Sequence, residues 1–277
     1  TSGTQSGVYL PKEVAAPVDV RRLPNAIRQA IEFYNYVPIT RTLTEAISIP
    51  IQDDTGNTGQ AQSQSATSGT AVDPSLTGSV TLNPTLYSSK QQWLSNTTVN
   101  AVDFDLFAYM LPMLQRRLEK AQESAWVTSL KGATSTVTTA SPTAITYAQI
   151  ISLEHSLGAA YRPDSCFILS DSAYQQIRSL VDSNNRPIMD LDPTNQFQAR
   201  IHGKPVFVSD YMDNVAATNV PIAYASAGAF LVFDAGLKRI ARYILQPAYP
   251  DQTGFELFAN GDFNFVAAGV RTLVMHA

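Results

Sequence analysis

The stretch from Ala46 to Thr98 constrains the fold more than any other part of this 277-residue sequence. It begins with AISIPIQ and ends with GSVTLNPTLYSSKQQWL, two runs whose composition favours β-strands. Between them, residues 52–78 contain almost no large apolar side chains. Polar loops of this length are uncommon inside compact domains, and a two-stranded hairpin is only marginally stable alone. We therefore expect a protruding β-arm that must find its packing partner elsewhere.

The first 23 residues have no helical period and contain two prolines. They predict an extended arm, which is ordered only if it lies on another surface. A short amphipathic helix is predicted directly after this arm, because a proline suits the first turn of a helix and apolar residues then recur at helical spacing. The residues concerned are Pro24, Ile27, Ala30, Ile31 and Tyr34.

Residues 103–131 give the clearest helical signal in the sequence. Pro112 interrupts the run, so we expect either a kink at this residue or a helix that begins near it. Lys131 and Gly132 form a suitable C-terminal stop. At about 1.5 Å per residue, the helix would be on the order of 40 Å long and would act as a spine. Its predicted apolar stripe comprises Phe104, Phe107, Leu111, Leu114, Leu118, Ala121 and Ala125.

The following third of the chain alternates between helices and strands. Thr146 and Gln149 form a capping-box pattern that opens a helix. Residues 165–170 read as a buried strand, and Asp171 is placed to cap a second helix. No βαβ repeat is regular enough to indicate a doubly wound sheet, so a mixed α+β fold is expected.

The segment IHGKPVFVSDYMD (201–213) poses a choice between a phosphate loop and a strand. In a phosphate loop, a Ser or Thr follows the Gly-Lys pair to hold magnesium, whereas Pro205 follows Gly203 and Lys204 here. The segment therefore predicts a tight turn into a buried strand, which a proline can begin. Alternation along this strand should direct Val206 and Val208 to one side and Phe207 to the other.

The C-terminal part of the chain is rich in strand signals. Residues 222–235 read as two strands around Ala227 and Gly228, and residues 237–247 as one long strand. The segment YPDQTG (249–254) has the composition of a turn. Further strands are expected from there to the last residue.

No pattern in the sequence indicates catalysis or metal binding. The three histidines, His155, His202 and His276, have no zinc-site spacing, and no Gly-x-Ser-x-Gly elbow is present. The single cysteine, Cys166, lies in an apolar run that is typical of a buried position. We expect no catalytic, cofactor-binding or metal site. The alternative from a different functional class is a soluble hydrolase or transferase, whose active site would be assembled from residues distant in sequence.

Charge and hydropathy narrow the possible partners. Charged residues make up 15% of the chain and the net charge is −4, without the basic footprint of a dedicated nucleic-acid-binding protein. The uncharged polar composition fits a protein that covers its surface with copies of itself. No apolar run approaches the roughly 20 residues needed to span a membrane, so no membrane partner is expected.

The order of the predicted elements resembles that of the major capsid proteins of tailed bacteriophages, the Hong Kong 97 fold family. The resemblance covers about residues 25–277. It implies a capsid protein, and a shell protein of an encapsulin-like nanocompartment, which shares the fold, is the alternative. Three segments carry the resemblance: LEKAQESAWVTSLKG (118–132), SCFILSDSAYQQIRSLVDSNNRPIM (165–189) and IHGKPVFVSDYMD (201–213).

The resemblance also implies a domain organisation of the Hong Kong 97 type. It contains an N-terminal arm, an extended β-loop, a peripheral domain with the long spine helix, and an axial domain. The implied boundaries are 1–35 for the N-terminal arm and helix, 46–98 for the extended loop, 36–45 with 99–139 and 236–277 for the peripheral domain, and 140–235 for the axial domain.

The partners and location follow from the same resemblance. The chain would not be an enzyme and would assemble with itself into pentamers and hexamers of an icosahedral shell. This shell would enclose double-stranded DNA by weak, nonspecific contact and would be part of the virion, assembled in the cytoplasm of the bacterial host. Scaffold, portal and cement proteins are further candidate partners.

Some members of this family crosslink their shell covalently, through an isopeptide bond between a lysine of the extended loop and an asparagine of the peripheral domain. A glutamate assists this reaction. In this sequence, residues 52–78 contain no lysine. Lys90 lies at the base of the extended loop, and Glu256 and Asn260 are available in the peripheral domain. A nucleophilic amine must reach its partner directly, so we expect a shell that is held together without covalent bonds.

Overall fold

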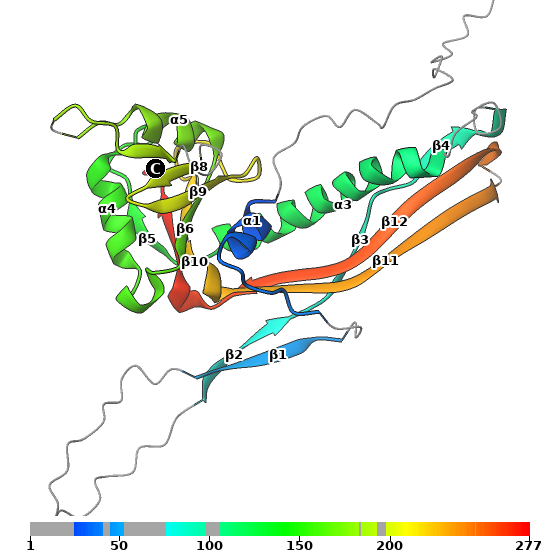
Figure 1. Cartoon of the computed structure of the whole chain (residues 1–277), viewed down its shortest axis with the longest axis horizontal. Coiled ribbons are helices and arrows are strands. Elements are labelled where there is room, and N and C mark those ends of the chain that lie inside the picture. Colours follow the sequence, from blue (N-terminus) through cyan, green and yellow to red (C-terminus); the bar gives the residue numbers. More distant parts are fainter. Residues whose placement is uncertain are drawn as a thin grey trace, which may run out of the picture.

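The computed structural model describes residues 25–40, 45–52, 76–97, 106–182, 184–192, 198–246 and 248–277. Within these ranges the chain forms a globular body, an elongated body and a hairpin arm that projects from the place where the two bodies meet (Figure 1). The predicted N-terminal arm, and residues 53–75 of the polar excursion, lie outside the described residues. The mixture of helices and sheets confirms the α+β class.

The described elements have the following bounds. The α-helices are α1 (Ala26–Phe33), α3 (Leu106–Lys131), α4 (Tyr147–Ser156) and α5 (Asp171–Ser179). The strands are β1 (Ile47–Gln52), β2 (Leu76–Leu82), β3 (Thr85–Ser88), β4 (Gln92–Ser95), β5 (Ser135–Thr138), β6 (Ser165–Leu169), β7 (Met189–Asp192), β8 (Gln198–Ile201), β9 (Lys204–Val208), β10 (Ile222–Ser226), β11 (Phe230–Gln246), β12 (Tyr249–Phe265) and β13 (Val270–Val274).

A seven-stranded sheet forms the globular body, in the order β5-β13-β10-β6-β9-β8-β7. The β6–β9 and β5–β13 pairs are parallel, and the other pairs are antiparallel. On one face, Leu153 of α4 and Ile177 of α5 pack in one apolar cluster with Phe167. On the other face, Ile27 of α1 belongs to a second cluster with Phe207. Burial of both faces explains why β6 is buried along its whole length, as its sequence predicted.

The segment from 201 to 213 is a turn followed by a buried strand, as predicted. Gly203, with φ of +77°, completes the turn between β8 and β9. Val206 and Val208 pack in the cluster under α4 and α5, and Phe207 packs in the cluster under α1. The alternation of β9 across the sheet is therefore confirmed.

Strands β5 and β13 belong to the sheet of the globular body. They lie within the ranges 99–139 and 236–277, which the family resemblance implied for the peripheral domain. After β12, a short 3-10 turn at Ala267–Gly269 brings the chain to β13, which pairs with β10. Burial of Val270 and Leu273 in the two clusters holds β13 in this sheet.

The elongated body is built on a long hairpin of β11 and β12, which has 17 residues in each strand. The prediction of a turn at YPDQTG was wrong. These residues begin β12, and Gln246 already pairs with Tyr249 across the end of the hairpin. Pairing with β4 on the other edge of β12 holds these residues in the strand. A glycine is needed at position 254, because a Cβ there would lie 2.8 Å from the Trp93 ring.

Helix α3 packs along one face of this hairpin (Figure 1). It runs without interruption from Leu106 to Lys131 and includes Pro112, so the alternative in which the helix begins near Pro112 was wrong. A proline within a helix removes one backbone hydrogen bond. Packing of Met110 and Leu114 against β12 holds the helix on the sheet on both sides of that residue.

The predicted apolar stripe of α3 holds over only part of the helix. Leu114 and Leu118 are buried as expected, whereas Ala125 is exposed. The buried side shifts to Trp126 and Leu130, because the second half of the helix packs on α1 and the globular body as well as on the base of the long hairpin, where the Trp126 ring stacks on Phe263.

The helix caps are set by short polar contacts. The backbone N–H of Thr146 donates to Gln149 Oε1 at 2.8 Å, as the capping-box pattern predicted. For α5, however, the cap is Ser170 and not Asp171. The Ser170 hydroxyl accepts from the backbone N–H of Ala173 at 3.3 Å, and Asp171 lies in the first turn.

Candidate assembly surfaces

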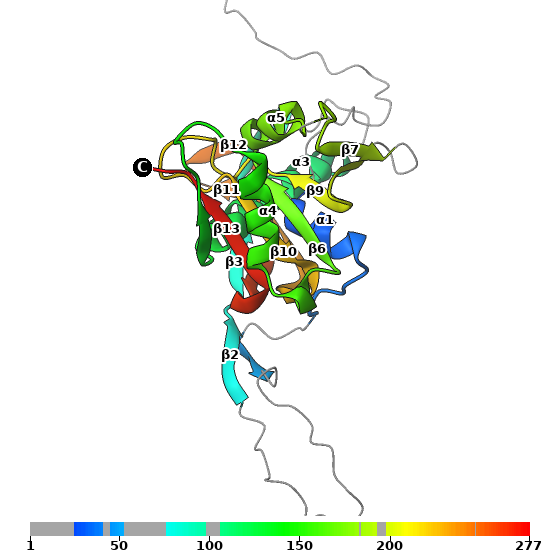
Figure 2. The same ribbon diagram turned by 90° about the vertical axis from the view of Figure 1, so that its left-hand side faces the viewer.

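The β1–β2 arm projects away from both bodies (Figures 1 and 2). Its antiparallel register pairs Ile49 with Val80 and Ser48 with Thr81. Cross-strand partners share a face of a ribbon and neighbours along a strand alternate, so the arm has one apolar face and one hydroxyl face. On the hydroxyl face, the Ser48 and Thr81 hydroxyls are 3.0 Å apart and hydrogen-bonded.

The apolar face of the arm is covered by the body only near the root. Leu82 is fully buried against Phe233, and Ile47 and Ile49 pack partly against the same cluster. Further out, Ile51 lies opposite Gly78, which is exposed. A two-stranded ribbon has too little core of its own to be stable alone. The outer half of this face therefore needs a surface from outside the described chain.

The elongated body has one sheet face without a helix over it in the described part of the chain. Phe255 and Leu257 face α3, so the alternate residues of β12 and their cross-strand neighbours point to the opposite face. We call this opposite face the bare sheet face. Leu86 is 63% exposed there, and Tyr249 is 42% exposed. The apolar residues of this face are Leu86, Trp93, Tyr243, Tyr249 and Phe258.

The aromatic rings of the bare sheet face contact one another. The rings of Trp93 and Tyr249 are stacked with 4.5 Å between centroids, and Trp93 also lies 6.1 Å from Tyr243. This surface was not predicted from the sequence. Its residues come from four different strands, and each strand alone has an ordinary strand pattern. One feature of the sequence could have indicated it, namely that the run from Phe255 to Phe258 has apolar residues on both faces of the strand.

Glu256 lies within the bare sheet face and is 8% exposed. One carboxylate oxygen accepts from the Ser88 hydroxyl, and the other accepts from the Tyr243 hydroxyl at 2.9 Å. This second bond raises the pKa of Tyr243 above its usual value. Asn260 lies on the same face of β12, and Lys90 is exposed at the turn after β3. Glu256 thus supports its own sheet, with both carboxylate oxygens hydrogen-bonded.

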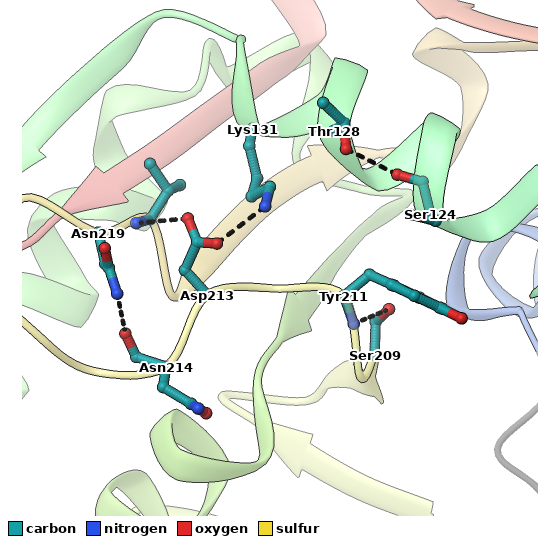
Figure 3. Close-up of polar contacts among 9 residues, drawn as sticks. Ser124, Thr128, Lys131, Ser209, Tyr211, Asp213, Asn214 and Asn219 are labelled. Atoms are coloured by element: carbon teal, nitrogen blue, oxygen red, sulfur yellow. Dashed lines mark hydrogen bonds and ion pairs between the residues drawn. The ribbon is translucent and has the colours of Figure 1, made fainter. Parts of the chain in front are cut away.

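Polar contacts fix the globular body to the elongated body. Lys131, the last residue of α3, donates from Nζ to Asp213 Oδ1 at 2.8 Å, and Asp213 Oδ2 accepts from the backbone N–H of Val220 at 3.3 Å (Figure 3). Glu123, which is 3% exposed, accepts from the Ser209 hydroxyl at 2.9 Å. These bonds join α3 to the loop after β9, so the spine and the sheet are held as one unit.

Arg28 of α1 makes a second link at this junction. Its guanidinium donates to Asp234 Oδ2 at 3.1 Å and to Gln122 Oε1 at 3.3 Å. The guanidinium carbon also lies 5.0 Å from the centroid of the Trp126 ring. Helix α1 is therefore held to α3 and to β11 by charge as well as by packing.

The candidate residues for phosphate or metal binding, Lys204 and His202, make contacts within the fold. Lys204 Nζ donates to the carbonyl oxygens of Arg162 at 2.5 Å and Pro163 at 3.0 Å. His202 Nδ1 lies 2.7 Å from Glu154 Oε1, and its Nε2 lies 3.1 Å from the Tyr147 hydroxyl. Lys204 therefore supports the turn before β6 and does not face an anion site.

The structure brings together no metal site from the candidate histidines. Among the described residues, no three His, Cys, Asp or Glu side chains are grouped closely enough to hold a metal ion. Cys166 is fully buried, and this burial raises the pKa of its thiol. In the same ranges, no helix is both long enough and apolar enough to span a membrane.

Comparison with known proteins identifies the family. The model of the phage capsid family matches residues 20–267. Among solved structures, the capsid of an empty GTA particle has a TM-score of 0.74 at 17% identity, over 99% of this chain and 98% of that chain. A chain from Microbacterium phage Oxtober96 has a TM-score of 0.60 at 11% identity, over 96% of each chain. A search of curated proteins found no match.

A more distant structure has the same fold. The virus-like particle from Pyrococcus furiosus has a TM-score of 0.55 at 9% identity, over 90% of this chain and 96% of that chain. At such identities the structures establish the fold, which confirms the Hong Kong 97-type architecture expected from the sequence. The family match spans most of the sequence. This chain therefore belongs to the phage capsid family and is a capsid protein of the virion.

Proposed function

We propose that copies of this chain assemble, as pentamers and hexamers, into an icosahedral shell around the double-stranded DNA of a tailed phage. One observation carries the proposal: the chain has an arm whose apolar face is uncovered beyond its root and a sheet face with exposed apolar side chains. The arm points away from its own bare sheet face (Figure 1). An arm of one copy and the bare sheet face of another could therefore cover each other.

In this assembly, the apolar face of the arm lies on the bare sheet face of an adjacent copy. Ile51 and Val80, which are half-buried, supply the arm's outer apolar surface. Leu86 and Tyr249 supply exposed apolar surface on the sheet. Such a contact is head-to-tail, because each copy gives an arm to one neighbour and receives one from another. Head-to-tail contacts close into rings when the rotation between copies permits it.

The axial and peripheral domains are proposed to correspond to the two bodies. The globular body would be the axial domain and the elongated body, with α3 as spine, the peripheral domain. The placement of β5 and β13 supports moving residues 135–138 and 270–274 from the peripheral to the axial domain. The arm would be the extended loop.

The remaining partners are proposed from the net charge and from the family. A net charge of −4 supports limited, nonspecific contact with packaged DNA. The hydrogen bonds of Glu256 to Ser88 and Tyr243 support a structural role for this residue and a shell without covalent crosslinks. Scaffold, portal and cement proteins are further candidates, and we propose no enzymatic activity.

The phage reading is favoured over a nanocompartment, because the matching family model describes phage capsids. The content of purified particles separates the two functions. Packaged double-stranded DNA supports the phage shell, whereas a protein cargo without DNA supports the compartment.

Electron microscopy of the purified chain tests assembly directly. Closed particles are expected for the wild type, and Leu86→Glu is expected to give unassembled but folded subunits, because a charge would be placed in the covered surface. Leu86→Ile is the matched control and should assemble. Folded wild-type protein that stays monomeric at high concentration would refute the proposal, and assembly of Leu86→Glu would refute this interface.

A further inference from the structure

The root of the arm is held by side chains from the far end of β12. Asn264 Nδ2 donates to the carbonyl oxygen of Thr81 at 2.9 Å. Asp262 Oδ2 accepts from the backbone N–H of Asn83 at 2.5 Å. Between these two contacts, Leu82 is buried against Phe233. The three contacts fix three consecutive residues, at the point where β2 ends.

The backbone register explains why this point is a branch between arm and body. Strand β3 pairs with β12 as far as Thr85 opposite Gly261. The N–H of Ser89 donates to the carbonyl of Leu257, and in an antiparallel ladder every second residue faces the partner strand. Counting back from Ser89, the next N–H directed to β12 beyond Thr85 is that of Asn83.

The Asn83 N–H bonds to a side chain of β12 and not to its main chain. A carboxylate holds the two strands further apart than a main-chain carbonyl does. The chain therefore departs from the sheet here and continues outwards as β2. Pro84, between Asn83 and Thr85, has a fixed φ and limits the conformations of this departure.

We propose that Asp262 is a positioning residue for shell assembly, whose carboxylate sets the direction in which the arm leaves the body. The inference rests on the proposed function, since the direction matters only if the arm must reach another copy. The seven residues of β2 span roughly 23 Å at about 3.3 Å each, so a tilt of about 10° would move the far end by about 4 Å. A shift of that size is enough to misplace an apolar contact.

The surroundings of Asp262 indicate that its acceptor oxygen matters for the arm and that its negative charge does not. Partial burial raises the pKa of Asp262, although hydrogen bonds from the backbone of Asn83 and Phe263 oppose this rise. The site therefore disfavours the negative charge while it uses the acceptor oxygen. An asparagine keeps an acceptor oxygen of the same reach and has no charge. Asp262→Asn should hold the arm, and Asp262→Ala should release it.

The test measures the arm direction in the unassembled full-length chain. Spin labels are attached to cysteines introduced at Ser79 on the arm and Ser129 on α3, both exposed positions. Cys166 should stay unlabelled, because it is fully buried and burial raises the pKa of its thiol. Pulsed electron paramagnetic resonance then gives the distribution of distances between the two labels.

Ser79 lies four residues from Asn83, roughly 13 Å along the strand, so a tilt of about 10° would move it by about 2 Å. The expected result is a distribution that shifts or broadens by about 2 Å or more in Asp262→Ala and stays at the wild-type distance in Asp262→Asn. Asp251→Ala is the matched control, because Asp251 is exposed at the other end of β12. If Asp262→Ala does not fold, Asp262→Ser serves instead, since its hydroxyl is too short to reach Asn83. An unchanged distribution in the Ala or Ser variant overturns the proposal.

Assembly of the same variants completes the test. Asp262→Ala should give fewer or irregular particles by electron microscopy, and Asp262→Asn should restore wild-type particles. If the arm moves in Asp262→Ala but particles are normal, Asp262 does not position the arm for assembly. If the wild type forms no particles, the proposed function fails, while the distance measurement still decides whether Asp262 sets the arm direction.

Discussion

Lys131 and Asp213 form an ion pair of 2.8 Å that connects the last residue of α3 to the loop after β9 (Figure 3). Both side chains are partly exposed, at 22% and 34%, so the pair itself is weak. Asp213 also accepts from the N–H of Val220, which fixes the return of the loop towards β10. Asp213 is therefore expected to contribute more to the stability of the fold than Lys131 does.

Asp213→Ala is expected to lower the free energy of unfolding by about 1–2 kcal/mol, because it removes both the ion pair and the bond to Val220. Lys131→Met is the control that removes only the ion pair, and it should cost about 0.2–1 kcal/mol. Urea unfolding of unassembled protein measures both. Equal losses in the two variants would show that the bond to Val220 contributes nothing.

Gly254→Ala is expected to destabilise the elongated body by about 1–3 kcal/mol, because overpacking forces neighbours to move. The added Cβ would lie 2.8 Å from the Trp93 ring. Trp93 must then leave its stack on Tyr249, so the tryptophan emission spectrum should also change. Gly78→Ala is the control, since no atom lies within 4 Å of its Cβ position. Wild-type stability and emission in Gly254→Ala would contradict this packing.

Arg162 is expected to stabilise the C-terminal end of α4. Its Nε and Nη2 donate to the carbonyl oxygens of Leu157 at 2.9 Å and His155 at 3.1 Å. Helix carbonyls at this end lack partners within the helix, and a cation there is favourable. Arg162→Ala should therefore cost about 1–2 kcal/mol and speed amide hydrogen exchange in α4. Arg178→Ala, at an exposed position of α5, should leave exchange in α4 unchanged.

Stability should fall at high pH in part because of Tyr34. Burial raises the pKa of Tyr34, and its hydroxyl donates to the carbonyl of Ser165 at 2.7 Å. An unfolded tyrosine loses its proton near pH 10, whereas folded Tyr34 keeps it. Its contribution is thus fully present below about pH 10 and is lost as the pH rises further towards the folded pKa.

Tyr34→Phe should accordingly be less stable than the wild type at pH 8, by about 0.5–1.5 kcal/mol, because the hydrogen bond is lost. This difference should shrink between about pH 10 and 12, since phenylalanine has no proton to release. Unfolding by urea at a series of pH values measures it. A difference that stays constant to pH 12 would show that Tyr34 ionises normally.

The elements with a strict local period were predictable from the sequence. Strand β9 alternates between two buried faces, and the period of two in Val206, Phe207 and Val208 was sufficient to place each side chain. Helix α1 was equally clear, because its buried residues follow one helical stripe. In both cases the environment is uniform along the element.

Prediction failed where one element passes between different environments. Ala125 continues the stripe of α3, but around that residue the helix packs on α1 and the globular body as well as on the long hairpin, and the buried side turns to Trp126. YPDQTG has the residues of a turn, yet pairing with both β11 and β4 holds it as a strand. Spacing along one segment contains no information about such partners.

The candidate surfaces were predictable to different degrees. The need of the arm for a partner followed from composition alone, because residues 52–78 contain almost no large apolar side chains. The bare sheet face could not be predicted, since Trp93 and Tyr249 become neighbours only through the pairing of β4 with β12. The role of Asp262 was hidden for the same reason, because its partner Asn83 is distant in sequence.

The two sides of the β1–β2 ribbon differ in chemistry, with isoleucine and valine on one side and serine and threonine on the other. A neighbour added upside down would meet hydroxyl groups that water already solvates well, and little apolar surface would be removed from water. Only subunits that share the same inward and outward sides would gain the full burial energy. The ribbon would therefore allow a growing lattice to reject inverted subunits before the curvature of the particle is complete.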